Sequence, residues 1–277
     1  MATIQTPFQL IDIWDIFDGT ENQFQSYERS LHPEVDTFES HNPQLFSLQR
    51  NYFLQGVLQS NDKDETAYHE ALVHPAMFAH HDPFNVAIIG GGDGASLREI
   101  LKHKSVEKVK MIEVDKIMVE SSKKYLPSWS DCSDIIGSTP SCFNDERLQI
   151  LYENAFAWFI NNGKGGIEKK IEEENSSCVD KIIETEEKEI FDVIVMEALD
   201  PQEISESDTK SYYEDDTFVR SLFNSLSKDG ILVMHIGSSP EHKDLVDNMG
   251  ENKKRSQKMN MIEFVGFKRC HVYEEVR

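Results

Sequence analysis

The spacing of hydrophobic residues changes character near residue 62. Before that point, β-branched and aromatic residues mix with polar ones in short stretches. Two of these, FQSYERSLHPEVDTFES and QLFSLQRNYFLQGVLQ, lie around an HNPQ turn. Short stretches of this kind, separated by turn residues, are typical of β-strands. Residues 1–62 are therefore expected to form a small N-terminal β-meander domain.

A helical period begins at Asp64, in the segment DETAYHEALVHPAMFAHH. The apolar residues Ala67, Ala71, Leu72 and Phe78 recur there near the spacing of one helix face. Aspartate is also a residue type that caps helix N-termini. We expect a helix that Asp64 caps and that carries these four residues on its apolar face.

Beyond this helix, apolar strand-like runs alternate with helical segments. The expected strands are Val86–Gly90, Lys108–Glu113, Leu148–Tyr152, Phe191–Met196 and Ile231–Ile236. The expected helices are Ser96–Lys102, Lys116–Tyr125, Ala155–Ile160 and Asp216–Leu226. Apolar strands that alternate with helices are typical of a parallel sheet covered on both faces. Residues 63–277 are thus expected to form a doubly wound, Rossmann-like α/β domain.

Two segments interrupt this alternation. PSWSDCSDIIGSTPSCFND is expected to be a long loop because it is rich in serine, aspartate and proline. The stretch near 163–190, GKGGIEKKIEEENSSCVDKIIETEEKEI, begins with glycines and continues with charged residues. Its composition predicts a solvated, mobile acidic insertion that is helical in part.

The formal charge of −22 argues against nucleic acid or an anionic membrane surface as a partner, because both require clustered Lys and Arg. It is compatible with a cationic ligand. No stretch has the roughly 18 apolar residues of a membrane span, and MATIQTPFQLIDIWDIFDG lacks the pattern of a signal peptide. The four cysteines form no C-x-x-C pair, so neither a zinc site nor a disulfide framework is expected, and the expected compartment is cytoplasmic.

The candidate chemistry is concentrated in VAIIGGGDGAS, residues 86–96. Its glycines, including Gly90, Gly92 and Gly94, fit G-x-G-x-x-G/A between a strand and a helix, where a ligand can approach bare backbone. Glu113 ends the next strand, where a carboxylate can accept hydrogen bonds from the hydroxyls of an adenosine ribose. This pairing fits NAD and S-adenosyl ligands alike, and a tight turn that binds nothing is the structural alternative.

Asp93 separates the two ligand classes. A carboxylate next to a dinucleotide pyrophosphate would repel it by about 1 kcal/mol in water, and several times more in a partly dry site. The same carboxylate would attract a sulfonium or an ammonium group. The turn therefore favours adenosine attached to a cation, and NAD becomes a minor alternative.

Three stretches together resemble the polyamine aminopropyltransferases, the spermidine and spermine synthase family. They are YFLQGVLQSNDKDETAYHEALVHPA, VAIIGGGDGASLREILKHKSVEKVKMIEVD and FDVIVMEALDP, in this order. The resemblance covers roughly Tyr52 to Asp200, apart from insertions, and continues more weakly to His235. Within the family, the segments YHEALVHPA and REILKHKSVEKV are more similar to the thermospermine synthase branch.

The resemblance implies a methyltransferase-type Rossmann-like fold and transfer of an aminopropyl group from decarboxylated S-adenosylmethionine. The acceptor would be putrescine, spermidine or a related polyamine, and methylthioadenosine would be released. Neither a metal nor a redox cofactor is implied, and a homodimer formed through the N-terminal strands is expected. The family continues past HVYEE, whereas this sequence ends at Arg277; an incomplete sequence and a lost part of the acceptor site both remain open.

Donor-binding roles carry over by position. The resemblance implies that Asp93 holds the donor ammonium and disfavours ordinary S-adenosylmethionine, and that Glu113 binds the ribose. Gln59 would contact the polar groups of the donor. Asn154 stands where the family usually has an aspartate that accepts a hydrogen bond from adenine, so it would bind without charge assistance.

The acceptor side of the site carries the largest departure from the family pattern. Tyr68 and His69 match the YHE helix, which lines the passage between the donor tail and the acceptor amine. Glu197 and Asp200 stand where the family has two aspartates, the first as proton acceptor and the second to fix the amine. A shift of about one bond length can reduce a rate about 100-fold. The extra methylene of Glu197 therefore implies either a rebuilt site or weak activity.

Two further functions stay open at this stage. A catalytically weak or silent family member that binds a nucleoside or a partner subunit would explain Glu197, Asn154 and the early end of the sequence. A small-amine N-methyltransferase would fit the same fold and Glu113, although Asp93 argues against it. His74, His80 and His81 have poor spacing for metal ligands and are expected to be surface or packing residues.

Overall fold

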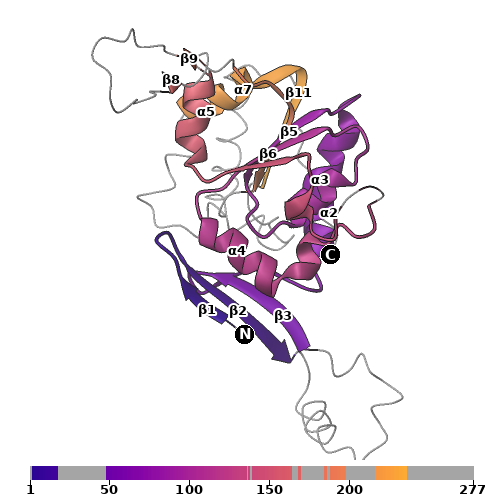
Figure 1. Cartoon of the computed structure of the whole chain (residues 1–277), viewed down its shortest axis with the longest axis vertical. Helices are drawn as coiled ribbons and strands as arrows, with labels where there is room; N and C mark the ends of the chain where they lie inside the picture. Colours follow the sequence, from indigo (N-terminus) through magenta and orange to yellow (C-terminus); the bar gives the residue numbers. More distant parts are fainter. Residues whose placement is uncertain are drawn as a thin grey trace, which may run out of the picture.

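The computed structural model describes residues 2–17, 48–135, 137, 139–163, 168–169, 184–185, 188–197 and 216–235. Three predictions lie outside these residues: the strand-like stretch FQSYERSLHPEVDTFES, most of the acidic insertion, and the placement of Asp200. The described chain forms a small antiparallel sheet and a larger parallel sheet with helices on both faces (Figure 1).

The N-terminal sheet is a four-stranded antiparallel meander in the order β1-β2-β3-β4. Its strands are β1 (Ala2–Gln5), β2 (Leu10–Phe17), β3 (Leu48–Leu54) and β4 (Val57–Asn61). Gln55 and Gly56 join β3 to β4 with φ values of 52° and 79°, as a tight two-residue hairpin turn requires. The predicted strands of this region are therefore confirmed where the structure describes them.

One face of this meander packs against the larger part of the protein. The cross-strand pairs Ile11–Leu54 and Ile13–Tyr52 are buried on that face. They share one hydrophobic cluster with Met118 and with other residues of the helical layer. The described hydrophobic contacts therefore connect the two sheets through side chains of β2 and β3.

The larger sheet has five parallel strands in the order β11-β10-β5-β6-β7. They are β5 (Asn85–Gly90), β6 (Lys108–Ile112), β7 (Leu148–Leu151), β10 (Phe191–Glu197) and β11 (Leu226–Met234). The chain runs outward from β5 to β7 and then crosses to β10 on the other side of β5. This reversal creates a topological switch point between β5 and β10, where open α/β sheets place their ligands. The doubly wound α/β prediction is confirmed.

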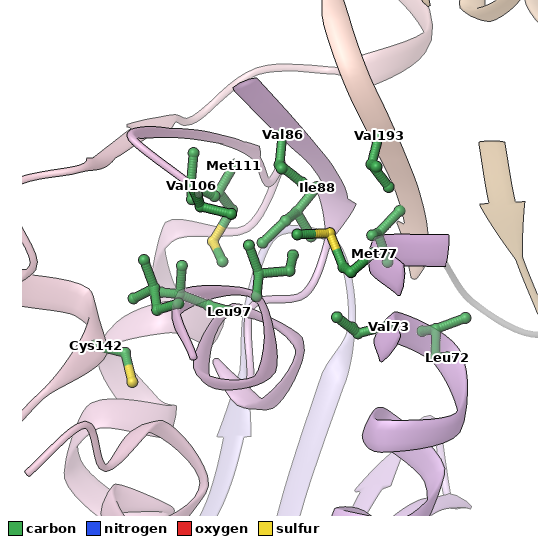
Figure 2. Packing of buried hydrophobic residues seen from close by; sticks show 14 of the residues in the cluster. Leu72, Val73, Met77, Val86, Ile88, Leu97, Val106, Met111, Cys142 and Val193 are labelled. Atoms are coloured by element: carbon green, nitrogen blue, oxygen red, sulfur yellow. The ribbon is translucent and has the colours of Figure 1, made fainter. Parts of the chain in front are cut away.

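Five described α-helices accompany the sheets: α2 (Glu65–Ala79), α3 (Ala95–Leu101), α4 (Lys116–Tyr125), α5 (Ala155–Gly163) and α7 (Asp216–Asn224). The alternation along β5 explains how both faces of the large sheet are covered. Val86 and Ile88 belong to one core cluster, with α2 and α3, whereas Ala87 and Ile89 belong to another, with α5 and α7. Figure 2 shows the first cluster, in which strand residues meet Leu97 of α3 and side chains of α2.

The buried face of α2 differs from the expected one. Phe78 is 76% exposed and Ala67 is exposed, so two of the four expected apolar positions point to solvent. The face that is buried comprises Glu65, His69, Leu72, Val73, Ala76 and Met77. Leu72 is the one expected residue among these six, and two of the six are polar, so apolar spacing located the helix but not its full buried face.

Asp64 stands at the N-cap position of α2, but its side chain makes no capping hydrogen bond. Its carboxylate instead accepts a hydrogen bond from the Asn61 side chain at 3.1 Å. The start of the helix was predicted correctly, and the capping role of the Asp64 side chain was not.

Strand β11 begins at Leu226, five residues before the expected start at Ile231, and its pairing with β10 contains a register shift.

The segment between α4 and β7 is more compact than the predicted loop. It contains two short 3₁₀ helices, η3 (Pro127–Ser130) and η4 (Cys142–Asn144). Trp129 is 1% exposed, and its indole N–H donates to Asp62. The expectation of no disulfide is wrong here, because Cys132 and Cys142 are bonded and buried.

The disulfide forms because the segment folds back on itself. Asp131 and Ser141 make an isolated antiparallel bridge, and the backbone N–H of Cys132 donates to the Pro140 carbonyl. A pairing ten residues apart has no C-x-x-C signature, so a search for that motif could not find it.

Within the acidic insertion, the structure describes two short strands, β8 (Glu168–Lys169) and β9 (Glu184–Thr185), which pair antiparallel. None of the described helices is both long and apolar enough to cross a membrane.

The disulfide leads to a stability prediction. Closing a loop of this size restricts the unfolded chain and contributes about 2–3 kcal/mol, so reduction should lower the melting temperature by roughly 5–10 °C. The measurement is a thermal melt with and without a thiol reductant, with free thiols counted by alkylation and mass spectrometry. The double variant C132A/C142A should melt near the reduced protein and should not respond to the reductant. A melting temperature that reduction leaves unchanged would contradict this contribution.

Candidate active site

The candidate site lies at the switch point, where the carboxyl ends of β5 and β10 are neighbours. Gly90 and Glu197 are register partners across these two strands. The glycine turn follows β5, and Gly90, Gly91 and Gly94 all have positive φ, between 72° and 89°. The turn thus has the backbone conformation that the glycine pattern predicted, and it lies beside the end of β10.

The glycines also make room for acidic side chains. A Cβ atom on Gly91 would lie 3.0 Å from Glu197 Oε2, and one on Gly92 would lie 2.9 Å from Glu113 Oε2. Both separations are shorter than ordinary contacts with a carbon atom. The nearest atoms to these Cβ positions are side-chain carbons of Ile88 and Met118, each at 2.8 Å, so the bare backbone makes room for apolar packing as well as for the two carboxyl groups.

Asp93 is positioned by the start of α3. One carboxylate oxygen, Oδ1, accepts a hydrogen bond from the backbone N–H of Ala95 at 2.8 Å. The other, Oδ2, lies 3.7 Å from His69 Nε2. The residue as a whole is 9% exposed, so Oδ2 faces a largely enclosed space.

His69 lies between Asp93 of the glycine turn and Glu197 of β10. Its Nε2 is 2.8 Å from Glu197 Oε1 and 3.7 Å from Asp93 Oδ2, and the residue is 1% exposed. His69 belongs to the buried face of α2, and its contacts with the two acids explain why this helix buries a polar side chain. The structure therefore brings together His69, Asp93 and Glu197, three residues that the sequence assigned to the site.

The electrostatics of this trio favour a protonated His69. Burial alone would lower the pKa of the imidazole, but the charges of Glu197 and Asp93 outweigh burial and raise the pKa well above its ordinary value. Burial, together with repulsion from Asp93, raises the pKa of Glu197, and His69 partly offsets this increase. A cation between the two acids is what allows both to be buried.

One oxygen of Glu197 has no hydrogen-bond partner. Within the described residues, the buried atoms Glu197 Oε2 and Ser96 Oγ both lack one. Hydrogen bonding from Ser96 nevertheless lowers the pKa of Glu197, so its hydroxyl is close enough to donate to this carboxyl group after a small rotation.

Glu113 follows β6 and lies against the glycine turn. It is 8% exposed, and its Oε1 accepts the backbone N–H of Asp115 at 2.8 Å. Burial raises its pKa to about 7, with further contributions from the charges of Asp115 and Asp93. The carboxyl group therefore changes its charge near neutral pH and stands where a ribose-binding acid is expected.

Tyr68 lies next to the trio through ring contacts. Its ring packs edge-on against His69, with centroids 4.9 Å apart, and against His235, which follows β11, at 5.7 Å.

Tyr52 is a nearby residue that the sequence analysis did not assign to the site. Its buried hydroxyl donates to Met118 Sδ, and burial and then Asp93 and Glu113 raise its pKa well above the ordinary value.

The other predicted site residues lie elsewhere or outside the described chain. Gln59 is on β4, and its amide donates to the Val57 carbonyl. Asn154 is exposed and caps α5, because its Oδ1 accepts the backbone N–H of Ala157. Asp200 lies outside the described residues. The ligand contacts of these three side chains stay predictions.

Two groups of side chains have the spacing of metal ligands. One is the trio itself, and the other is Glu70, His74 and Glu99. Coordination by the trio would require a neutral imidazole, whereas its surroundings favour the protonated form. In the second group, Glu99 is already ion-paired with Arg98 and Lys102. In the metal-free protein, the two acids of the trio therefore favour a proton on His69.

Comparison with known proteins extends this picture to a family. The spermine/spermidine synthase domain model matches residues 65–265. Among curated proteins, the chain is 35% identical over 228 residues to a polyamine aminopropyltransferase of Hydrogenobaculum sp. (strain Y04AAS1), and 33% identical over 227 residues to polyamine aminopropyltransferase 1 of Aquifex aeolicus (strain VF5). Each match covers 82% of this chain and 65% of the relative, so the chain spans somewhat less than two thirds of these proteins.

Solved structures agree with the sequence matches. Spermidine synthase from Thermotoga maritima is 25% identical with a TM-score of 0.59, and the match covers 96% of this chain and 62% of that one. A spermidine synthase in complex with the transition state analogue AdoDATO is also 25% identical, with a TM-score of 0.62 and coverage of 96% and 64%. Because the domain model spans well over half of the chain and includes the trio, this protein belongs to the spermine/spermidine synthase family.

Proposed function

We propose that this protein is an aminopropyltransferase of polyamine biosynthesis. It would transfer the aminopropyl group of decarboxylated S-adenosylmethionine to an amine of putrescine, spermidine or a related polyamine and release methylthioadenosine. The observation that carries the proposal is Asp93, an acid in the glycine turn whose Oδ2 lies 3.7 Å from His69 Nε2, the nitrogen that also contacts Glu197. Relatives named polyamine aminopropyltransferase, at 30–35% identity, support the same reaction.

Asp93 suits the donor of this reaction better than other adenosine ligands. Decarboxylated S-adenosylmethionine carries an ammonium group and no carboxylate, so its tail would gain a charge-assisted contact with Asp93. Ordinary S-adenosylmethionine would bring a carboxylate towards Asp93, and NAD would bring a pyrophosphate. Each of these anions would be repelled in a site that is largely shielded from water.

The chemistry requires a neutral acceptor amine and a base. The amine nitrogen forms a bond to the carbon next to the sulfonium, and the bond between this carbon and sulfur breaks. Sulfur keeps the electron pair and leaves as the thioether of methylthioadenosine. The proton lost by the nitrogen passes to the Glu197 carboxylate, whose unpaired Oε2 can accept it.

The surroundings of Glu197 favour a site rebuilt for glutamate over a weakened one. The longer side chain reaches His69 at 2.8 Å, and the missing Cβ of Gly91 provides the space that its second oxygen occupies. The contact with His69 favours the ionised carboxylate, which is the form that a base requires. His69 thus supplies a positive charge next to Glu197, where the acceptor amine would bind.

The direct test is incubation with either decarboxylated or ordinary S-adenosylmethionine and a panel of diamines and polyamines. Chromatography and mass spectrometry should detect methylthioadenosine together with an acceptor that is longer by one aminopropyl unit, and only with the decarboxylated donor. A methylated amine formed from ordinary S-adenosylmethionine would instead indicate a methyltransferase. Binding of methylthioadenosine without turnover of any acceptor would indicate a silent member of the family.

The role of Glu197 leads to a second prediction. E197Q keeps the size of the side chain but removes its basicity, so turnover should fall by about 100-fold or more while affinity for methylthioadenosine is retained. E197D should also lose rate, because the shorter side chain withdraws from His69. Steady-state kinetics and calorimetry check both expectations. An E197Q variant that turns over at the parental rate would exclude Glu197 as the base, and a faster E197D variant would mean that glutamate is a defect.

The pKa of Glu113 leads to a third prediction. Ribose hydroxyls donate to a carboxylate, so methylthioadenosine should bind preferentially when Glu113 is ionised. Because the pKa of Glu113 in the empty protein is about 7, affinity should rise with pH and be about tenfold higher at pH 8 than at pH 6.

Calorimetry across this pH range is the measurement. E113Q should bind more weakly and lose the pH dependence between pH 6 and 8. E120Q, which changes an exposed glutamate of α4, is the matched control and should behave as the parent. If E113Q keeps the parental slope, another group is responsible for the pH dependence.

A further inference from the structure

A buried ion pair lies behind His69, on the side away from the two acids of the site. Glu65, the first residue of α2, accepts two hydrogen bonds from the Arg98 guanidinium of α3, at 2.9 and 3.1 Å. Both side chains are less than 10% exposed. A buried, doubly bonded pair of this kind holds its two partners in one geometry.

Glu65 contacts His69 in two ways. The backbone carbonyl of Glu65 is 2.5 Å from His69 Nδ1, and its carboxylate oxygen Oε2 is 3.5 Å from the same atom. A carbonyl oxygen can only accept a hydrogen bond, so Nδ1 carries a proton. With Nδ1 turned towards Glu65, Nε2 faces Glu197 and Asp93.

Arg98 connects this arrangement to the glycine turn. It follows Asp93 by five residues, on the helix that the turn begins, and it also donates to the Trp129 carbonyl at 2.9 Å. The Glu65–Arg98 pair therefore joins the helix that carries His69 to the helix whose start carries Asp93. This pair adds a polar connection to the apolar packing of the two helices, in which Leu72, Val73 and Leu97 share one cluster.

We propose that Glu65, held by Arg98, is a positioning residue for the reaction. It keeps the His69 ring turned so that Nε2 stands between Asp93 and Glu197. This inference rests on the proposed function for its catalytic consequence, but the orientation of His69 can be tested in the free protein. It assigns to the buried polar face of α2 a role that apolar packing would not require.

The charges around His69 set the direction of the effect. Glu65 faces the ring from α2, Asp93 from the turn and Glu197 from β10, while Tyr68 packs against the ring and His235 lies beyond Tyr68. The Glu65 carboxylate is ionised near neutral pH. Although burial raises its pKa, hydrogen bonds from His69 and Arg98 outweigh burial and lower the pKa to about 2. Removing this negative charge should destabilise the protonated imidazole.

The neighbouring residue Glu99 offers a matched control. Its buried carboxylate bonds to the same Arg98, at 2.7 Å, and also contacts Lys102 and His74. E65Q and E99Q each remove one buried carboxylate from the Arg98 network. Only E65Q removes a carboxylate that lies next to His69, so a difference between the two variants separates positioning from general loss of packing.

The experiment follows the His69 imidazole by NMR as a function of pH in the free parent protein, E65Q and E99Q, with H69N to assign the signal. We expect E65Q to move the midpoint of the His69 titration down by about one pH unit or more, and E99Q to move it by less than about 0.3. E65D keeps the charge but withdraws it from His69 by one methylene, so its midpoint should fall between those of the parent and E65Q, more than about 0.3 pH unit below the parent. It provides the test if E65Q does not fold. Equal midpoints in E65Q and E99Q, or in E65D and E99Q should E65Q not fold, would overturn the proposal.

Kinetics add the catalytic consequence. For E65Q, kcat should fall about tenfold with little change in KM for the donor, and its pH profile should shift in the same direction as the NMR midpoint. E99Q should keep the parental pH profile. A parent without turnover would refute the proposed function while the NMR comparison still decides the role of Glu65.

Discussion

The contact between His69 and Glu197, 2.8 Å long and buried, is the interaction on which the rest of the site depends. Asp93, Glu113 and Glu197 converge on one end of a parallel sheet, and three acids in one dry space repel one another. Among the described residues, the protonated imidazole of His69 compensates for part of this charge. The site is therefore built around a shortage of positive charge, which is a property that a polycationic ligand can satisfy.

The fold meets this electrostatic demand with ordinary elements. The strand reversal between β5 and β10 brings Glu197 next to the glycine turn, and the absent side chains of Gly91 and Gly92 leave space for two carboxyl groups. Helix α2 contributes its cation by turning a face that includes Glu65 and His69 towards the sheet. The buried carboxylate of Glu65 is in turn paired with the Arg98 guanidinium, because a buried charge without a partner would be destabilising.

The same feature explains where prediction from sequence succeeded and where it failed. The strands and most helices were correct because apolar runs between turn residues determine them locally. The glycine pattern and the strand that follows it drew attention to Asp93 and Glu113, and the family resemblance drew attention to Glu197; their ligand contacts stay predictions. The buried face of α2 was predicted wrongly because polar residues occupy it. The Cys132–Cys142 disulfide was missed, and so was the Glu65–Arg98 pair, because each depends on segments that only the folded chain brings together.

The glutamate at position 197 follows from the same electrostatics. An aspartate there would be one methylene shorter, and its carboxylate would withdraw from His69 towards the end of β10. The longer side chain keeps the acid close to the His69 cation and places Oε2 near the Ser96 hydroxyl. Under the proposed function, the donor ammonium would compensate the charge of Asp93, and the acceptor amine would donate to Glu197. The two substrates together would then bring positive charge to both acids that contact His69.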